Sequence, residues 1–352
     1  MSEKAIAYRA DIDGLRAVAV VPVVLFRAGF SQLSGGFVGV GVFFVISGYL
    51  VSSVIANVID NGTFSFLRFY ERRVRRLMPT LFTVLSVCLV AGFLLLSPFD
   101  FRKLASSALY TLIFASNFHF ASAGGYFDQP LGLAPLLHTW SLAVEEQFYI
   151  VWPPLLLLCF SRARRAIVWI VPGLLAVSFA IAVGLAGDSS ASFYWPHTRA
   201  WELLIGCVLA LGLLPAPPRR SVADVASIIG LALITFAILT YDETTPFPGA
   251  AALAPTVGAG LVIWSGANGA SLGGRLLSLR PFVLIGLVSY AWYLWHWPMF
   301  AFFRIVDGRE PGVLEAWILI AVSLGLAFAS WQYLEKPVRR RGTSSTCARH
   351  WR

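Results

Sequence analysis

The sequence predicts an all-α integral membrane protein with about ten transmembrane helices and one re-entrant or interfacial segment. Its 352 residues are 58% hydrophobic and only 13% charged, whereas soluble domains are roughly 45–50% apolar and about 25% charged. Apolar runs of about 20 residues, long enough to cross a hydrocarbon core of roughly 30 Å, recur along the chain. The net charge of +9 comes from short basic clusters at the ends of these runs. Such clusters indicate membrane orientation and not a nucleic-acid partner.

The predicted spans are apolar runs bounded by charges or by clusters of Gly and Pro. They are 15–31, 36–58, 79–97, 141–160, 166–186, 198–214, 222–240, 250–266, 281–304 and 313–334. The stretch 104–120 is also apolar but carries several polar residues. If this stretch crossed the membrane, every later loop would lie on the opposite side from the one that its charge indicates. We therefore expect the stretch to be re-entrant or interfacial. The strongly basic loops then face the cytoplasm, as do both termini, in the inner membrane.

We expect one membrane domain over 1–337 and a short, basic, disordered cytoplasmic tail over 338–352, because no linker or strong internal repeat divides the chain. The N-terminus lacks a signal-peptide cleavage site, so the first span is expected to be retained. The four cysteines form no CxxC pair. They are expected to be packing residues, and no metal site is predicted.

The first predicted span carries two arginines. Ionisable groups inside a span cost about 2.5–3.5 kcal/mol each, so they are functional candidates by default. Arg16 and Arg27 are 11 residues apart, a rise of roughly 16 Å and close to three turns, so they are expected to share one helix face. Either side chain could also reach an interface by snorkelling. Otherwise the guanidinium of Arg27 needs a carboxylate, carbonyls or water as partners.

An arginine-rich run lies directly before the third span. It contains Arg72, Arg73, Arg75 and Arg76. Charge alone favours an ordinary cytoplasmic loop. Several guanidiniums close together also bind phosphates bidentately, and a CoA thioester brings phosphates from the cytoplasm.

A polar motif from His138 to Tyr149 opens the fourth span and includes Trp140. Its adjacent carboxylates, Glu145 and Glu146, could be partners of the helix dipole. A role as dipole partner explains a single Glu at the surface. It explains less well two adjacent Glu residues that are followed directly by an apolar run. Adjacent helix residues point about 100° apart, so we expect only one of the pair to reach a given site.

Smaller polar signals occur in two later spans. Glu202 lies near the start of 198–214, and His296 lies among three tryptophans, including Trp295, within 281–304. The tryptophans could form an interfacial aromatic belt. The run could equally form the wall of a substrate or acyl-chain pocket.

Five of these motifs, in order, resemble those of the acyltransferase-3 family of bacterial membrane O-acyltransferases. They are Asp11 to Ala17, Gly36 to Leu50, Arg72 to Pro79, His138 to Tyr149, and Ser289 to Pro298 followed by Tyr333 to Pro337. The second and fourth are most similar to members fused to a periplasmic SGNH-type hydrolase-like domain. We therefore expect this chain to be a stand-alone or truncated membrane module.

The resemblance implies a cytoplasmic acyl-CoA donor, usually acetyl-CoA. It implies as acceptor a hydroxyl of a cell-surface glycan, such as lipopolysaccharide O-antigen, exopolysaccharide or peptidoglycan. Arg16 corresponds to the arginine of the family's Arg-x10-His pair, the arginine-rich run to its donor-handling motif, and Glu145 to the carboxylate of its Trp-Ser-Leu-x-x-Glu pattern. A lipid-linked form of the glycan and a separate periplasmic partner are also expected.

Two positions depart from the family pattern. Arg27 stands where the histidine of the pair is expected, and Gly41 stands where an aspartate is expected. Arginine cannot act as a base because its pKa is above about 12, and loss of a general base lowers the rate by about 10²–10⁴.

Three hypotheses follow from these departures. The chain is an active O-acyltransferase whose base is His138, Glu145 or Glu146, or it is a catalytically impaired acyltransferase fold that acts as a partner or regulator. The third hypothesis is a transporter or flippase for a lipid-linked glycan or an acyl group.

Overall fold

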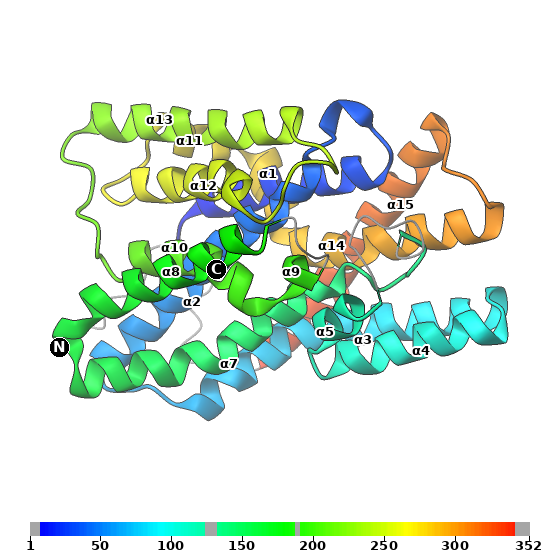
Figure 1. The fold of residues 1–352 in the computed structure, drawn as a ribbon, viewed down its shortest axis with the longest axis horizontal. Coiled ribbons are helices and arrows are strands. Elements are labelled where there is room, and N and C mark those ends of the chain that lie inside the picture. Colours follow the sequence, from blue (N-terminus) through cyan, green and yellow to red (C-terminus); the bar gives the residue numbers. More distant parts are fainter. Residues whose placement is uncertain (1–7, 124–131, 187–190, 342–352) are drawn as a thin grey trace. The chain divides into compact units, whose positions relative to one another are not determined.

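The computed structural model describes residues 8–123, 132–186 and 191–341. Over these ranges the chain is helical and contains no strand, as Figure 1 shows. The predicted all-α fold class is therefore confirmed.

The described residues form two compact units whose segments alternate along the chain. The first unit comprises Met1–Phe26, Phe30–Phe64 and Val144–Leu287. The second comprises Arg27–Gly29, Ser65–Ala143 and Val288–Arg352.

In the first unit, α2 (Gly39–Asp60) packs against α10 (Pro196–Ala210), and α8 (Ile167–Gly184) packs against α10 in turn. α11 (Arg220–Thr240) and α12 (Leu253–Ser265) form a second close pair. The α2 and α10 backbones meet at glycines. A Cβ on Gly48 would lie 1.9 Å from the Leu203 carbonyl oxygen, and one on Gly206 would lie 2.1 Å from that of Val45. Only glycine permits this approach.

Eight further elements of the described chain belong to the first unit. They are α1 (Ala10–Arg27, apart from its last residue), η1 (Ser31–Leu33), η2 (Gly36–Val38), most of α7 (Thr139–Arg162), η3 (Arg164–Ala166), α9 (Ala191–Tyr194), η4 (Ala250–Ala252) and α13 (Leu272–Leu277). α13, in the segment after α12, packs against α11.

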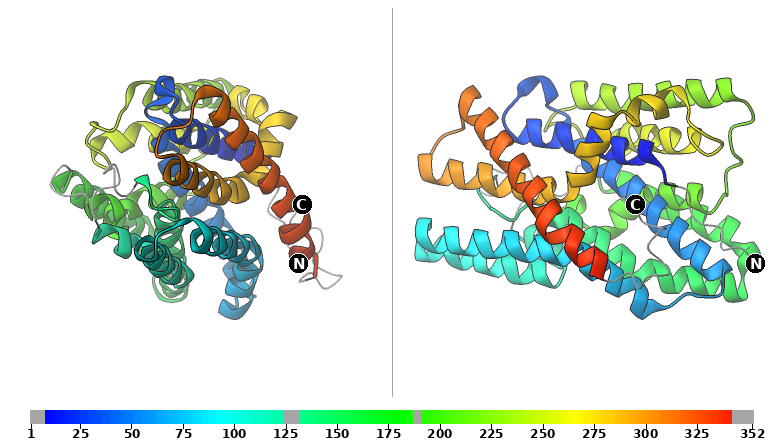
Figure 2. Two further views of the ribbon diagram at one scale, coloured as in Figure 1. Left: turned by 90° about the vertical axis from the view of Figure 1, so that its right-hand side faces the viewer. Right: turned by 180° about the vertical axis from the view of Figure 1, so that it is seen from behind.

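The second unit contains α3 (Phe66–Leu95), α4 (Pro98–Leu112), α5 (Ser116–Ala121), most of α14 (Arg280–Asp307), α15 (Val313–Ser330), the π-helical turn η5 (Trp331–Glu335) and α16 (Lys336–Arg341). α3 and α4 lie side by side, as the views of Figure 2 also show. The η5 turn packs on α3, where the Thr80 hydroxyl donates a 3.0 Å hydrogen bond to the buried Glu335 carboxylate.

Six helical segments of the described chain are long and apolar enough to cross a membrane: Gly36–Asp60, Phe66–Leu95, Thr139–Arg162, Arg164–Gly184, Arg220–Thr240 and Val313–Val338. They correspond to six of the ten predicted spans, and they indicate a membrane protein. The predicted spans 15–31, 198–214, 250–266 and 281–304 do not meet the same test. α10 and α12 are short, and α1 carries four charged residues. α14 is a continuous helix of 28 residues, but its Trp, Tyr and His residues lower its hydropathy. A count of ten spans stays a prediction.

Three boundaries differ from those expected. α3 begins at Phe66, with Ser65 as its cap, so the arginine-rich run lies inside a helix and not in a loop before residue 79. The segment 104–120 is divided between α4 and α5, which are separated at Phe114, where φ is +53°. A bulky residue in this left-handed region interrupts the helix. Beyond residue 337, α16 continues to Arg341, and the rest of the predicted tail lies outside the described residues.

Candidate functional site

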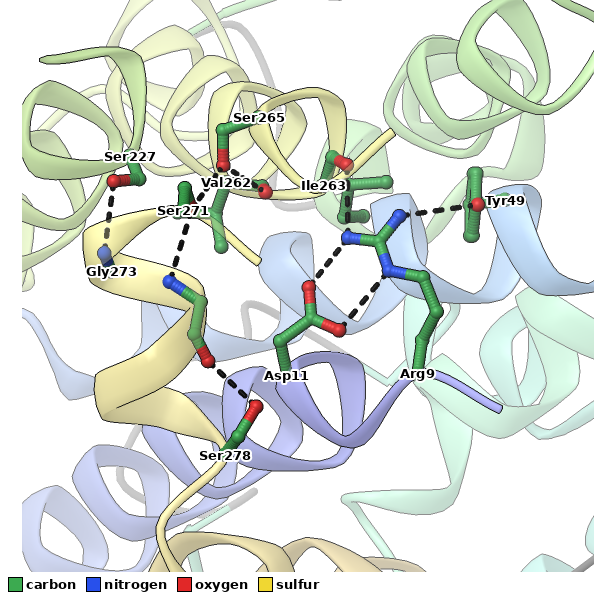
Figure 3. Close-up of polar contacts among 11 residues, drawn as sticks. Arg9, Asp11, Tyr49, Ser227, Val262, Ile263, Ser265, Ser271, Gly273 and Ser278 are labelled. Carbon is green, nitrogen blue, oxygen red and sulfur yellow. Dashed lines mark hydrogen bonds and ion pairs between the residues drawn. The ribbon is translucent and has the colours of Figure 1, made fainter. Parts of the chain in front are cut away.

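Two arginine–aspartate pairs occupy the start of α1 in the first unit. Arg9 contacts both carboxylate oxygens of Asp11, through Nη2 at 2.5 Å and Nε at 3.1 Å. Its Nη2 also donates to the Ile263 carbonyl at 3.0 Å, and its Nη1 donates to the Tyr49 hydroxyl at 3.4 Å. Figure 3 shows this network, in which one guanidinium connects the start of α1 to α2 and α12.

Arg16, a predicted catalytic residue, forms the second pair. Its Nη1 lies 3.2 Å from Oδ1 of Asp13, and the Tyr8 hydroxyl donates to Oδ2 of Asp13 at 2.7 Å. The carboxylate therefore holds the guanidinium from one side. With 18% of its side chain exposed, Arg16 keeps N–H donors for a bound group.

The carboxylate of Glu145 accepts hydrogen bonds from two hydroxyls, those of Ser47 on α2 and Tyr149 on α7. These two bonds fix the position of the carboxylate between α2 and α7. Glu145 is half-buried and Glu146 is buried. Both lie in the second turn of α7, which begins at Thr139, so the helix dipole does not account for them.

Glu202 forms a fully buried ion pair within α10, because its Oε1 lies 3.0 Å from Nη1 of Arg199 and both side chains are 0% exposed. The guanidinium carbon of Arg199 is also 5.0–5.4 Å from the ring centres of three phenylalanines, Phe44, Phe193 and Phe247. A Cβ on Gly41 would lie 3.1 Å from Oε2 of Glu202. An aspartate at that position would therefore bring a second carboxylate against this pair.

In the second unit, two imidazoles and a phenol meet where α7 begins. The ring centres of His138 and His296 are 5.7 Å apart, and Tyr293 lies 5.5 Å from the first and 5.3 Å from the second. The Tyr293 hydroxyl shares a 2.7 Å hydrogen bond with Ser141 and donates to the His138 carbonyl at 3.0 Å. Nδ1 of His296 lies 2.6 Å from the Tyr293 carbonyl.

Neither ring nitrogen of the buried His138 forms a hydrogen bond with the chain that the structure describes. Burial, and then the neighbouring His296, hold the pKa of the His138 imidazole well below its usual value, and the Arg27 charge lowers it further. The ring is therefore neutral near pH 7, and one of its two nitrogens can accept a proton from a bound hydroxyl.

Arg27 is the last residue of α1 and belongs to the second unit. It stacks on an aromatic ring of the same unit. Its guanidinium carbon lies 4.5 Å from the ring centre of Trp297, and that of Arg304 lies 5.7 Å from the same ring. Nη2 of Arg304 donates to the Arg27 carbonyl at 2.8 Å, and its Nε donates to Glu310 at 2.7 Å. The Arg27 guanidinium therefore contacts the indole face of Trp297, whereas the bond from Arg304 goes to the Arg27 backbone.

The arginine-rich run covers two turns of α3. Arg75 pairs with Glu71 at 2.6 Å, whereas Arg72 is exposed. Arg73 and Arg76 are half-buried. Because residues three and four apart are neighbours on a helix, Arg72 lies beside both Arg75 and Arg76.

The tryptophans are interior residues of the second unit, so the aromatic-belt interpretation is wrong for them. The Trp295 indole donates to Ser330 at 2.9 Å, that of Trp292 to Ser323 at 3.0 Å, and that of Trp297 to the Ala134 carbonyl at 2.7 Å. Trp140 is 0% exposed. Trp295 therefore connects α14 to α15 through its indole N–H. This N–H is then not available to a ligand.

Several residues with site contacts were not predicted from the sequence. Ser47 and Tyr293 lie inside the motifs but have no ionisable side chain near pH 7, and their importance appears only through Glu145 and His138. Arg199 had a local signal, since its position three residues before Glu202 brings the two charges together on a helix. Within the described residues, no group of three or more His, Cys, Asp or Glu side chains is placed to hold a metal ion.

The first unit thus carries hydroxyl-bonded carboxylates and an arginine with spare donors, and the second unit carries paired imidazoles. Groups of these kinds occur in the sites of group-transfer enzymes. The profile of the family described as "Acyltransferase domain" matches residues 9–332. The chain belongs to this acyltransferase-3 family, as the motifs predicted.

Three bacterial relatives are similar along nearly the whole chain. The peptidoglycan O-acetyltransferase OatA of Listeria monocytogenes is 33% identical over 95% of this chain and 56% of the relative. The putative peptidoglycan O-acetyltransferase YrhL of Bacillus subtilis is 33% identical over 96% and 56%. The O-acetyltransferase OatA of Staphylococcus aureus is 31% identical over 95% and 58%. The chain thus spans little more than half the length of these relatives, and no solved structure matches it.

Proposed function

We propose that the chain is the membrane module of an O-acyltransferase that transfers an acetyl group from cytoplasmic acyl-CoA to a hydroxyl of a cell-surface glycan. The observation that carries the proposal is the family match over residues 9–332. Two relatives are named for peptidoglycan, so we propose this acceptor ahead of lipopolysaccharide O-antigen. The proposed location is the bacterial inner membrane, with both termini in the cytoplasm.

In this proposal, arginine side chains bind the acyl-CoA donor. The side of α3 that carries the exposed Arg72 and the half-buried Arg76 suits the phosphates of CoA, because guanidiniums bind phosphates bidentately. The spare donors of Arg16 suit the thioester oxygen, where negative charge develops during acyl transfer. The hydrogen bond that Arg16 donates to Asp13 keeps the guanidinium oriented, which lowers the reorganisation that the reaction requires.

The acceptor hydroxyl needs a base, and we assign that role to His138. Its ring nitrogens are buried without hydrogen bonds, and Ser141 and Tyr293 lie beside its backbone. A protonated His138 would lie in a dry environment near the fixed charge of Arg27, which is unfavourable. Burial already makes the imidazole a weak base, and the charge of Arg27 weakens it further.

Arg27 also supports the second candidate function, a catalytically impaired acyltransferase. The charge of Arg27 lowers the pKa of His138, and arginine cannot replace a histidine base. Both effects slow transfer without disturbing the rest of the fold.

The test is transfer of labelled acetyl from acetyl-CoA to peptidoglycan fragments by the purified chain. We expect slow transfer by the chain as it is, and a rate roughly 10²–10⁴ higher in Arg27→His, because the substitution removes the fixed cation and adds a base. Arg309→His makes the same chemical change at an exposed arginine and should leave the rate unchanged. No transfer by either chain would contradict the proposed function, and equal rates would contradict the role given to Arg27.

A further inference from the structure

A cavity of about 270 Å³ lies beside Arg9 in the first unit. Its polar lining consists of Arg9 and Tyr49, and its apolar lining includes Leu209, Leu214, Ile263 and Trp264. Small-molecule sites are concave, mostly apolar and equipped with a few placed polar groups, and this cavity is just below their usual range of roughly 300–1,000 Å³.

The charge of Arg9 is already matched. Asp11 contacts the guanidinium through both oxygens, at 2.5 and 3.1 Å, so the pair presents little net charge to the cavity. A diphosphate placed here would meet the Asp11 carboxylate as well as the guanidinium. The cavity therefore suits a neutral ligand better than an anionic one.

Two donors remain for such a ligand. A guanidinium has five N–H bonds. Four of those of Arg9 are used by Asp11, the Ile263 carbonyl and Tyr49. One N–H on Nη1 remains, and Tyr49 keeps its O–H because its oxygen accepts from Arg9. Figure 3 shows the two groups facing each other, so together they suit one or two carbonyl acceptors.

The other walls offer apolar surface. The Trp264 indole donates its N–H to the Pro215 carbonyl at 2.8 Å, so the ring contributes its carbon atoms to the cavity and not its donor. The rest of the lining consists of leucine, isoleucine, proline, alanine and glycine residues. A chain of methylene groups with neutral carbonyls between them matches this pattern of apolar walls and paired donors.

The cavity also lies on the side from which the donor comes. It is lined by the segment before α1, the connection from α10 to α11 and the end of α12, all on the predicted cytoplasmic side. We infer that it binds the pantetheine arm of acyl-CoA, a neutral alkyl chain with two amide carbonyls. This inference rests on the proposed function, which supplies the donor.

Equilibrium binding to the purified chain tests the inference without requiring turnover. The probes are labelled acetyl-CoA, S-acetylpantetheine, which lacks the nucleotide, and adenosine 3′,5′-bisphosphate, which lacks the arm. Ala216→Phe fills the cavity from an exposed lining position, and Ala270→Phe is the matched control on an exposed residue outside the lining.

We expect Ala216→Phe to weaken acetyl-CoA and S-acetylpantetheine binding by roughly tenfold or more through overpacking, and to leave the nucleotide fragment unaffected. Tyr49→Phe should weaken both arm-containing probes about threefold to tenfold, through loss of one hydrogen bond. Weaker binding of the nucleotide fragment alone, or equal binding of all probes by both alanine variants, would overturn the inference and leave the proposed function standing. Failure of the unmodified chain to bind acetyl-CoA at all would overturn both.

Discussion

A guanidinium at position 27 affects a residue far from it in sequence. Arg27 stacks on Trp297, and its charge opposes protonation of His138. The resemblance of the motifs already marked Arg27 as a departure. The effect of the Arg27 charge on His138 could not be predicted. The two residues are separated by 111 positions, and no local pattern joins them.

The buried His138 predicts a pH-dependent stability. Its pKa is lowered in the folded chain, so below about pH 6.5, the ordinary value for histidine, the unfolded chain binds a proton that the folded chain does not. Stability therefore falls as the pH falls below that value, by at most about 1.4 kcal/mol per pH unit for this group. Thermal unfolding in detergent at pH 7.5 and 5.5 measures the effect. His138→Gln should reduce the difference between the two pH values, and an unchanged difference would contradict the assignment.

The hydroxyls on Glu145 predict a second effect at this scale. Ser47→Ala and Tyr149→Phe each remove one hydrogen bond to the carboxylate. Hydrogen bonds to charged groups contribute about 1.5–3 kcal/mol, so we expect each change to lower the transfer rate about tenfold to a hundredfold if Glu145 acts as a carboxylate.

Ser53→Ala is the matched control for Ser47→Ala. It makes the same substitution on α2 but removes only a bond from the Ser53 hydroxyl to the Tyr49 carbonyl of the same helix. Measurement of kcat and KM for all three variants separates a charge effect from general loosening of α2. Equal losses in Ser47→Ala and Ser53→Ala would count against a role for the carboxylate.

At the scale of elements, glycines decide where helices approach each other. Gly206→Ala would place a Cβ 2.1 Å from the Val45 carbonyl oxygen, whereas Gly173→Ala on α8 would meet no atom within 4 Å. We expect the first substitution to destabilise the chain by about 1–3 kcal/mol through overpacking. The second should be neutral or stabilising by up to about 1 kcal/mol through helix propensity.

Thermal unfolding monitored by size-exclusion fluorescence compares these two variants under one condition. Similar melting temperatures would show that α2 and α10 are less closely packed than the glycine contacts require.

Helix positions were predictable where apolar length alone decides them. The six segments that meet the length and hydropathy test were all predicted as spans. Boundaries were less predictable, because the arginine-rich run has good helix formers and continues α3 back to Phe66. The break at Phe114 depends on a left-handed backbone conformation. Nothing in the sequence indicated it, because position 114 is not the glycine or asparagine that usually adopts this conformation.

At the scale of the whole molecule, charge patterning and ordered motifs predicted the class and the family. They could not predict which polar residues meet. Ser47 approaches Glu145 across 98 positions, and Ser141 approaches Tyr293 across 152. Such pairs depend on how whole helices pack, which periodicity within one helix does not specify.

We propose that this membrane protein forms an ester on a glycan and does not simply move a substrate. Inside-out bacterial membrane vesicles that contain the chain, loaded with peptidoglycan fragments and supplied outside with labelled acetyl-CoA, test it most directly. The account predicts base-labile labelled acetyl on the enclosed glycan, formed faster with Arg27→His than with the unchanged chain. Labelled acetate inside without glycan ester, or export of unmodified glycan, in both forms would contradict it.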